Sequence, residues 1–159
     1  MAVGKSTVAK ALAEKLPHSV YFDGDWAWDI HPFTVSDENI QMVHENIAFM
    51  LNQFLRNSQI EHVIFTWVMQ EQGIIDQVLS DLTGNDFQLF NISLMADEAT
   101  LRAHFTDDPK RDENGENMAK ALSYLAKYEK LDSIKLDRTG KSSDESVGEI
   151  LELMKEVRK

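Results

Sequence analysis

The stretch Gly4-Lys5-Ser6-Thr7 constrains this chain more than any other feature, because it opens directly into a helix-forming segment. That helix is predicted from an apolar stripe at a spacing of four residues, formed by Val8, Leu12 and Leu16. The first turn of a helix presents unpaired N–H groups and the positive end of the helix dipole, so it can hold an anion. Glycine allows the backbone to approach phosphate oxygens closely, lysine adds a mobile positive charge, and a serine hydroxyl is a suitable ligand for Mg²⁺. We therefore predict that residues 4–7 bind phosphate.

This stretch is the second half of the motif G-x-x-x-x-G-K-[ST], which normally follows a strand. Gly4 takes the place of its second glycine, and the first would lie two positions before Met1. The strand that leads into the loop is also missing from this sequence. A competing interpretation is a chance helix cap, in which Ser6 or Thr7 does no more than cap the helix.

Composition limits the classes of partner. The net charge of −11 argues against non-specific binding to a nucleic acid backbone, which needs clustered Lys and Arg. The absence of cysteine excludes disulfides and thiolate metal sites. No apolar run approaches about 18 residues, so no membrane span is expected, and neither is a signal peptide. We expect a single domain over residues 1–159 in the cytoplasm, with no nucleic acid or membrane partner.

Predicted strands and helices alternate along the rest of the chain. Strands are expected at residues 20–22, 62–68, 87–95 and 133–136. Helices are expected from the N-cap Ser36 to about residue 56, and at residues 74–82, 98–105, 118–131 and 147–157. This alternation favours a parallel sheet covered by helices on both faces, with ligands at the carboxyl ends of its strands. We therefore expect residues 4–7, 23–25, 67–71 and 137–140 to meet at one edge of the sheet.

In element order and in three motifs the chain resembles the P-loop small-molecule kinases, a group that includes shikimate kinase, gluconate kinase and chloramphenicol phosphotransferase. The motifs are Gly4-Lys5-Ser6-Thr7, Phe22-Asp23-Gly24-Asp25 and Lys110-Arg111. The chain is also similar to bacterial proteins labelled AAA-family ATPases or predicted kinases. The resemblance implies an α/β, three-layer P-loop NTPase fold with sheet order 2-3-1-4-5, whose central first strand is missing from this chain. It also implies a lid-like segment at about residues 106–117.

The resemblance further implies ATP and Mg²⁺ as cofactors and roles for particular residues. Gly4, Lys5, Ser6 and Thr7 would bind the nucleotide, with Ser6 as a metal ligand. Asp23 would support the metal, and Asp25 would orient and deprotonate the acceptor. Arg111 would close from the lid. Arg102 would contact the nucleotide, although the arginine of the group falls at His104 in this chain.

Simpler interpretations stand beside these roles. Asp23-Gly24-Asp25 is also a favourable turn sequence, and Lys110-Arg111 is also an ordinary solvated basic pair. Four aromatic residues either line an acceptor pocket or pack in the core: Trp26, Trp28, Phe33 and Trp67. The strand ending at Thr66 lacks the acidic residue that many P-loop proteins carry there.

Three functions follow from these observations. The first is an ATP-dependent kinase that phosphorylates a small-molecule or nucleotide acceptor, as a monomer or homodimer. The second is a nucleotide-binding or regulatory P-loop module without an acceptor. The third is a truncated, non-catalytic fragment of a kinase.

Overall fold

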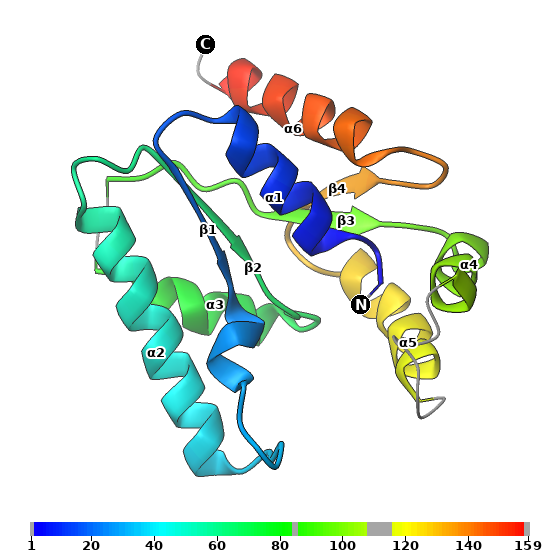
Figure 1. The fold of residues 1–159 in the computed structure, drawn as a ribbon, viewed down its shortest axis with the longest axis horizontal. Coiled ribbons are helices and arrows are strands. Elements are labelled where there is room, and N and C mark those ends of the chain that lie inside the picture. Colours follow the sequence, from blue (N-terminus) through cyan, green and yellow to red (C-terminus); the bar gives the residue numbers. More distant parts are fainter. Residues whose placement is uncertain (1, 84–85, 108–115, 158–159) are drawn as a thin grey trace. The chain divides into compact units, whose positions relative to one another are not determined.

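The computed structural model describes residues 2–83, 86–107 and 116–157. Contacts divide the chain into two compact units. Unit 1 consists of Met1–Ala11 and Leu89–Lys159, and unit 2 is Leu12–Gln88. Helix α1 (Lys5–Lys15), drawn in dark blue in Figure 1, begins in unit 1 and ends in unit 2. The predicted stripe of this helix is confirmed, since Val8 and Leu12 are buried and Leu16 is half-buried.

Unit 2 is built on two parallel strands, β1 (Ser19–Asp23) and β2 (His62–Thr66), which pair from Ser19↔His62 to Asp23↔Thr66. The 3₁₀ helix η1 (Gly24–Trp28) follows β1 directly, and α2 (Asp37–Arg56) and α3 (Gln72–Ser80) complete the unit. Phe22 packs in the core of this unit against Val43, Ile47, Leu51 and Val78.

The side chains that begin and end α2 explain its position in the sequence. Ser36 is the N-cap, as predicted, and its hydroxyl accepts a hydrogen bond from the Asn39 N–H at 3.2 Å. Near the other end, the Asn52 amide donates to the Asp81 carbonyl at 2.9 Å and accepts from the Thr83 N–H at 2.8 Å. Asn52 is buried, so it fixes the segment that follows α3 against α2.

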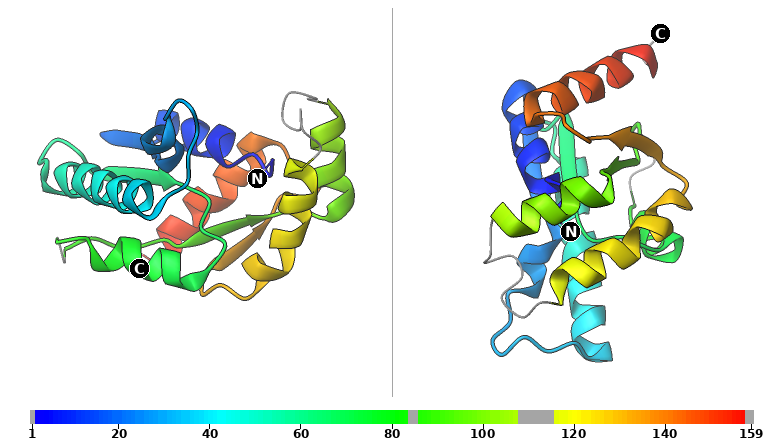
Figure 2. Two further views of the ribbon diagram at one scale, coloured as in Figure 1. Left: turned by 90° about the horizontal axis from the view of Figure 1, so that it is seen from below. Right: turned by 90° about the vertical axis from the view of Figure 1, so that its right-hand side faces the viewer.

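Unit 1 also contains two parallel strands, β3 (Ile92–Met95) and β4 (Ile134–Asp137), which pair from Ile92↔Ile134 to Met95↔Asp137 (Figure 2). Its helices are α4 (Glu98–Asp107), α5 (Asn117–Glu129) and α6 (Ser143–Val157), together with the start of α1. Val3, Ala96 and Leu101 form a buried cluster, so the segment before α1 is anchored by a core side chain.

The strand pairs agree with the predicted order. The order 2-3-1-4-5 counts the missing strand as strand 1, so β1, β2, β3 and β4 correspond to its strands 2, 3, 4 and 5. The observed pairs β1-β2 and β3-β4 are therefore its outer pairs 2-3 and 4-5. No strand precedes α1 in the described residues. β2 is half-buried throughout, whereas the sequence predicted a strand buried on both faces. Among the described residues, β2 has a strand partner along one edge only, so no neighbouring strand covers its other edge.

The bounds of β3 and α4 also differ from prediction. β3 is four residues long rather than the expected span of residues 87–95, and both Phe87 and Leu89 are exposed. α4 continues to Asp107, so residues 106–107 are helical rather than part of a loop. Residues 108–115 of the predicted lid lie outside the described residues, and its last residue, Asn117, begins α5. No helix among the described residues is long and apolar enough to span a membrane.

Candidate functional site

The turn before α1 has the geometry that a phosphate group requires. Gly4 has φ +87°, a conformation that side chains disfavour, and its carbonyl accepts the Val8 N–H at 3.0 Å, so α1 begins at Lys5. The first N–H groups of a helix have no acceptor within the helix, and α1 carries no acidic residue in its first turn. These residues therefore fit an anionic phosphate group at the start of α1.

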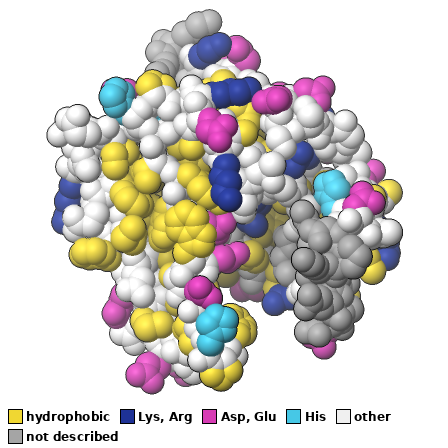
Figure 3. Space-filling model, viewed as in Figure 1, with side chains coloured by type: hydrophobic (Ala, Val, Ile, Leu, Met, Phe, Trp, Pro, Cys, Tyr) yellow, Lys and Arg dark blue, Asp and Glu magenta, His cyan; other side chains and the backbone are white. Residues whose placement is uncertain are grey.

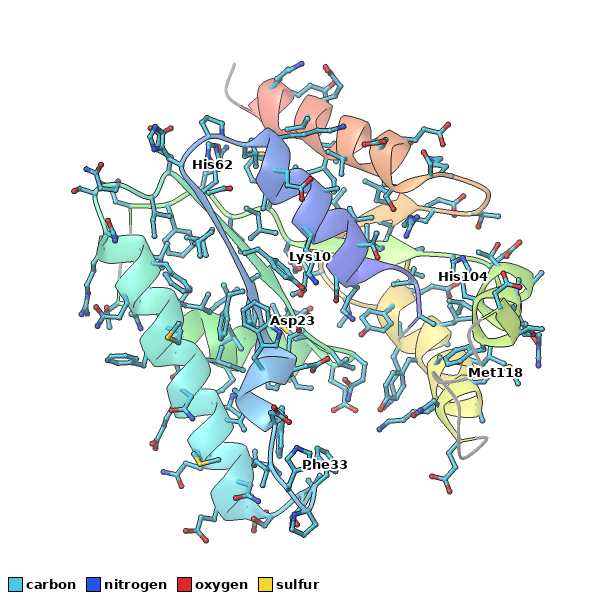
Figure 4. All side chains as sticks on the ribbon, viewed as in Figure 1. Lys10, Asp23, Phe33, His62, His104 and Met118 are labelled. Carbon is cyan, nitrogen blue, oxygen red and sulfur yellow. The ribbon has the colours of Figure 1, made fainter. Side chains whose placement is uncertain are left out.

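Two side chains of unit 1 hold the backbone of this turn from outside it. The Arg138 guanidinium donates to the Val3 carbonyl at 2.7 Å through Nη1 and to the Lys141 carbonyl at 3.3 Å through Nη2. His104, on α4, places Nδ1 2.8 Å from the Ala2 carbonyl (Figure 4). The Arg138 Nη1 lies so close to Gly4 that any Cβ there would overlap it. The loop conformation thus depends on residues distant in sequence as well as on glycine.

Arg138 comes from the turn that follows β4. Its backbone N–H donates to the Met95 carbonyl at 2.7 Å, which continues the pairing of β4 with β3. Partial burial lowers the pKa of the guanidinium, and its Nε has no hydrogen-bond partner among the described residues. The turn therefore holds a partly desolvated cation against the Gly4 backbone.

Two carboxylates flank the same turn. The Thr139 backbone N–H donates to Asp137 Oδ1 at 3.0 Å and is the main cause of the lowered pKa of Asp137. Two hydrogen bonds with Thr100 lower the pKa of Asp97, and the side-chain bond has a larger effect than the backbone bond. The Thr139 hydroxyl also accepts the Asp97 N–H at 3.1 Å, which links the ends of β3 and β4.

In unit 2, Asp23 ends β1 and caps η1 (Figure 4). Its Oδ1 accepts the Asp25 N–H at 3.2 Å, and its Oδ2 accepts the Tyr21 hydroxyl at 2.8 Å. The Tyr21 hydroxyl also lies 3.2 Å from Thr66 Oγ1, across the strand pair. Asp23 therefore has a structural role in the turn, whatever further role it has toward a metal.

Asp25 lies on η1 and lines a cavity of about 460 Å³. The other lining residues are the aromatic side chains of Trp26, Trp28 and Phe33, and Asp29. Trp28 and Trp67 also pack against the core of unit 2, whereas Trp26 and Phe33 are exposed. Gly24 is required beside Trp67, because a Cβ at that position would lie 2.6 Å from the indole ring. Of the four aromatic residues predicted to line a pocket or pack in the core, Trp28 does both.

The predicted nucleotide contact at Arg102 remains a prediction. Arg102 is exposed on α4, and its Nη2 lies 2.7 Å from Glu98 Oε1, one helical turn away. Arg111 lies outside the described residues. The described residues contain no group of three or more His, Cys, Asp or Glu side chains that could hold a metal ion.

Within each unit, the structure brings together parts of the predicted site. In unit 1, residues 4–7 and 137–140 meet through Arg138. In unit 2, residues 23–25 lie beside Thr66 and Trp67. Sequence reasoning missed Arg138, Tyr21 and the loop contact of His104. The position of Arg138 in a turn after a predicted strand was the available signal.

Comparisons with known proteins support the fold. A gluconokinase from Sinorhizobium meliloti 1021 matches with a TM-score of 0.65 and 17% identity, over 94% of this chain and 83% of its own. A sugar kinase from Janibacter sp. HTCC2649 matches with a TM-score of 0.68 and 14% identity, over 97% of this chain and 89% of its own. The Deinococcus radiodurans tunicamycin resistance protein matches with a TM-score of 0.65 and 14% identity, over 96% of this chain and 89% of its own.

No protein-family model matches the sequence, and neither does any curated protein. The structural matches nevertheless confirm the predicted α/β fold, which this chain shares with the gluconokinase and the sugar kinase.

Proposed function

We propose that this chain is an ATP-dependent phosphotransferase that moves the γ-phosphate of ATP to a small-molecule or nucleotide acceptor. The observation that carries the proposal is the turn at Gly4. Its positive φ, the start of α1 at Lys5 and the absence of acid in the first turn provide for a phosphate group, within a P-loop kinase fold.

In this proposal, Lys5 and the backbone amides of Gly4, Ser6 and Thr7 bind the phosphates. The Ser6 hydroxyl is a metal ligand, and Asp23 supports the same metal. Mg²⁺, when bound, neutralises charge on the phosphates. Arg102 contacts the nucleotide, and Arg111 brings a second cation from the lid.

Asp25 is the proposed base. It orients the acceptor hydroxyl and takes its proton as the acceptor oxygen forms a bond to the γ-phosphorus. The bond between that phosphorus and the oxygen bridging it to the β-phosphate breaks, which leaves ADP. The place of Asp25 beside a cavity supports this role, because an acceptor needs space next to the base.

Calorimetry with ATP and Mg²⁺ tests the phosphate site. Lys5→Ala should abolish measurable binding and turnover, whereas Lys10→Ala, the same change at an exposed position of α1, should leave binding unchanged. Equal binding by the wild type and Lys5→Ala would refute the assignment.

A screen of acceptors, read by ADP release, tests the base. Asp25→Asn should bind ATP normally and lose about 10²–10⁴-fold in transfer rate, the usual contribution of a general base. Unchanged transfer in Asp25→Asn would remove this residue from the mechanism.

A nucleotide-binding module without transfer is the second candidate. The observation that favours it is the end of β2, where Thr66 and not an acid lies opposite Asp23. Tight ATP binding with no ADP release across the acceptor screen would support this candidate over the kinase.

A further inference from the structure

The cavity beside Asp25 combines aromatic rings with acidic groups. Its lining is made by three aromatic side chains and two carboxylates from one short segment: Asp25, Trp26, Trp28, Asp29 and Phe33. η1 has about three residues per turn, so residues three apart share a side of it. Asp25 therefore lies on the same side of η1 as Trp28.

Two of the three aromatic side chains are exposed, and Trp28 is half-buried. Trp26 is 59% exposed and Phe33 is 67% exposed, although aromatic side chains of this size are usually buried. The rings of Trp28 and Phe33 lie 5.8 Å apart at an angle of 50°, so they form an angled pair rather than a closed stack. Phe33 lies on the loop after η1 (Figure 4). Such rings attract a cation placed over their faces.

The charge of unit 2 favours a cation as well. Residues 12–88 contain twelve Asp and Glu but only two basic residues, Lys15 and Arg56, which gives them a formal net charge of −10 out of −11 for the whole chain. Arg56 is in the last turn of α2, where its guanidinium donates to Thr83 Oγ1 at 2.7 Å. Hydrophobic and acidic side chains lie together with a histidine at the bottom of the space-filling view, where the segment around Phe33 is found (Figures 3 and 4).

An anionic acceptor is disfavoured at this cavity for the same reason. A carboxylate or phosphate is bound in proteins by Arg, Lys or clustered backbone N–H groups. The cavity lining contains no Lys or Arg, and the nearest Lys or Arg in the sequence is Lys15. His31 lies 3.1 Å from Asp29 and is the other titratable group of this loop.

We propose that this cavity binds an organic cation that carries a hydroxyl group, and that this class of molecule is the phosphate acceptor. The cationic group lies against the rings of Trp26, Trp28 and Phe33 and is neutralised by Asp29. The hydroxyl is held by Asp25. The role as acceptor rests on the proposed phosphotransferase function, whereas the binding of the cation does not.

Calorimetry without ATP tests the binding site alone. The probes are choline and 3,3-dimethylbutan-1-ol, which share shape and hydroxyl group but differ in charge. Contact with an aromatic ring favours a cation over a neutral group of the same shape, so two or three rings predict at least about fivefold tighter binding of choline. Sodium gluconate, an anionic polyol, should not bind.

Two substitutions have matched controls in unit 2. Asp29→Asn should weaken choline binding about three- to tenfold and leave the neutral alcohol unaffected, and Asp86→Asn should change neither. Phe33→Leu should weaken choline binding by a similar factor, whereas Phe49→Leu, at a position that is 62% exposed on α2, should not. All four side chains are exposed, so these variants should fold.

Equal affinity for choline and the neutral alcohol, no binding of choline at millimolar concentration, or an unchanged affinity in both Asp29→Asn and Phe33→Leu would overturn the proposal. ATP binding is measured in a separate titration. Choline binding without ATP binding would support the cation site and refute the phosphotransferase, whereas the opposite result would refute the cation site alone.

Discussion

Substitution of Gly4 by alanine tests whether the loop conformation depends on Arg138. Gly4 has φ +87°, and a Cβ there would overlap Arg138 Nη1. Because that atom is the end of a flexible side chain, Arg138 can move away. It would then lose its 2.7 Å hydrogen bond to the Val3 carbonyl.

Two energies make up the expected loss of stability. A residue with a Cβ in a left-handed conformation costs about 1–2 kcal/mol. A hydrogen bond from a charged group contributes roughly 1.5–3 kcal/mol, which we reduce to about 1–2 kcal/mol because Arg138 is only partly buried. Gly4→Ala should therefore lower the free energy of unfolding by about 2–4 kcal/mol, and Arg138→Ala by about 1–2 kcal/mol.

The double variant separates coupling from simple addition. If Gly4→Ala already breaks the Arg138 bond, the double variant should lose about 2–4 kcal/mol, the same as Gly4→Ala alone, rather than about 3–6 kcal/mol. The assay is urea unfolding followed by far-ultraviolet circular dichroism, because all three tryptophans lie in unit 2 and would report that unit. Hydrogen exchange of the Val8 amide, which bonds the Gly4 carbonyl, gives a local reading.

Gly148→Ala is the matched control. Gly148 is in α6, and a Cβ there would meet no atom within 4 Å. This change should raise the free energy of unfolding by about 0.5–1 kcal/mol, because alanine favours the helix. Additive losses for Gly4→Ala and Arg138→Ala, to within about 0.5 kcal/mol, would refute the coupling between the two residues.

Three further predictions concern stability. Asn52→Ala should lower the free energy of unfolding by about 2–4 kcal/mol in urea, because it leaves the Asp81 carbonyl and the Thr83 N–H without their partner. Ser142→Ala should cost about 1 kcal/mol by thermal unfolding, because the Ser142 hydroxyl accepts the Glu145 N–H at the start of α6. Asp97 and Asp137 have lowered pKa values in the folded state. Their contribution to stability is therefore present above about pH 4 and is lost as the pH falls through these lowered pKa values. Asp137→Asn should accordingly show a shallower loss of stability below pH 4 in acid titrations.

Local signals in the sequence predicted the helices well. The stripe from Val8 to Leu16 and the cap at Ser36 are properties of neighbouring residues, and both are present in the structure. A further local signal was missed. Ser142 and Glu145 have the spacing of a capping box, and the structure shows the reciprocal bonds, including Ser142 N–H to Glu145 Oε2 at 2.8 Å. That signal places the start of α6 at Ser143, four residues before the predicted start.

Long-range contacts explain the features that the sequence did not predict. β3 was expected from Phe87 onward, but a strand needs a partner, and its pairing with β4 begins at Ile92. Arg138 bonds a carbonyl 135 residues away, and His104 bonds one 102 residues away. No pattern of neighbouring residues specifies which carbonyl such a side chain will reach. The loop contacts of the candidate phosphate site therefore required the structure.

Asp23 illustrates how a structural role and a functional role can be separated at one residue. Its carboxylate caps η1 through the Asp25 N–H and accepts the Tyr21 hydroxyl, and these bonds alone would account for its presence. Asp23→Ala removes both and should lower the free energy of unfolding by about 2 kcal/mol, from one cap and one side-chain bond. Stability alone therefore does not distinguish a cap from a residue that supports a metal.

Asp23→Asn does make that distinction. Asparagine caps as well as aspartate, its oxygen can accept the Asp25 N–H, and its amide can donate to the Tyr21 hydroxyl, which then turns toward Thr66. The free energy of unfolding should change by less than about 0.5 kcal/mol, but the lost negative charge weakens any support for a cation. If Asp23 supports Mg²⁺, Asp23→Asn should need about tenfold more Mg²⁺ for half-maximal ATP binding or turnover. An unchanged Mg²⁺ requirement in this stable variant would leave Asp23 with the capping role alone.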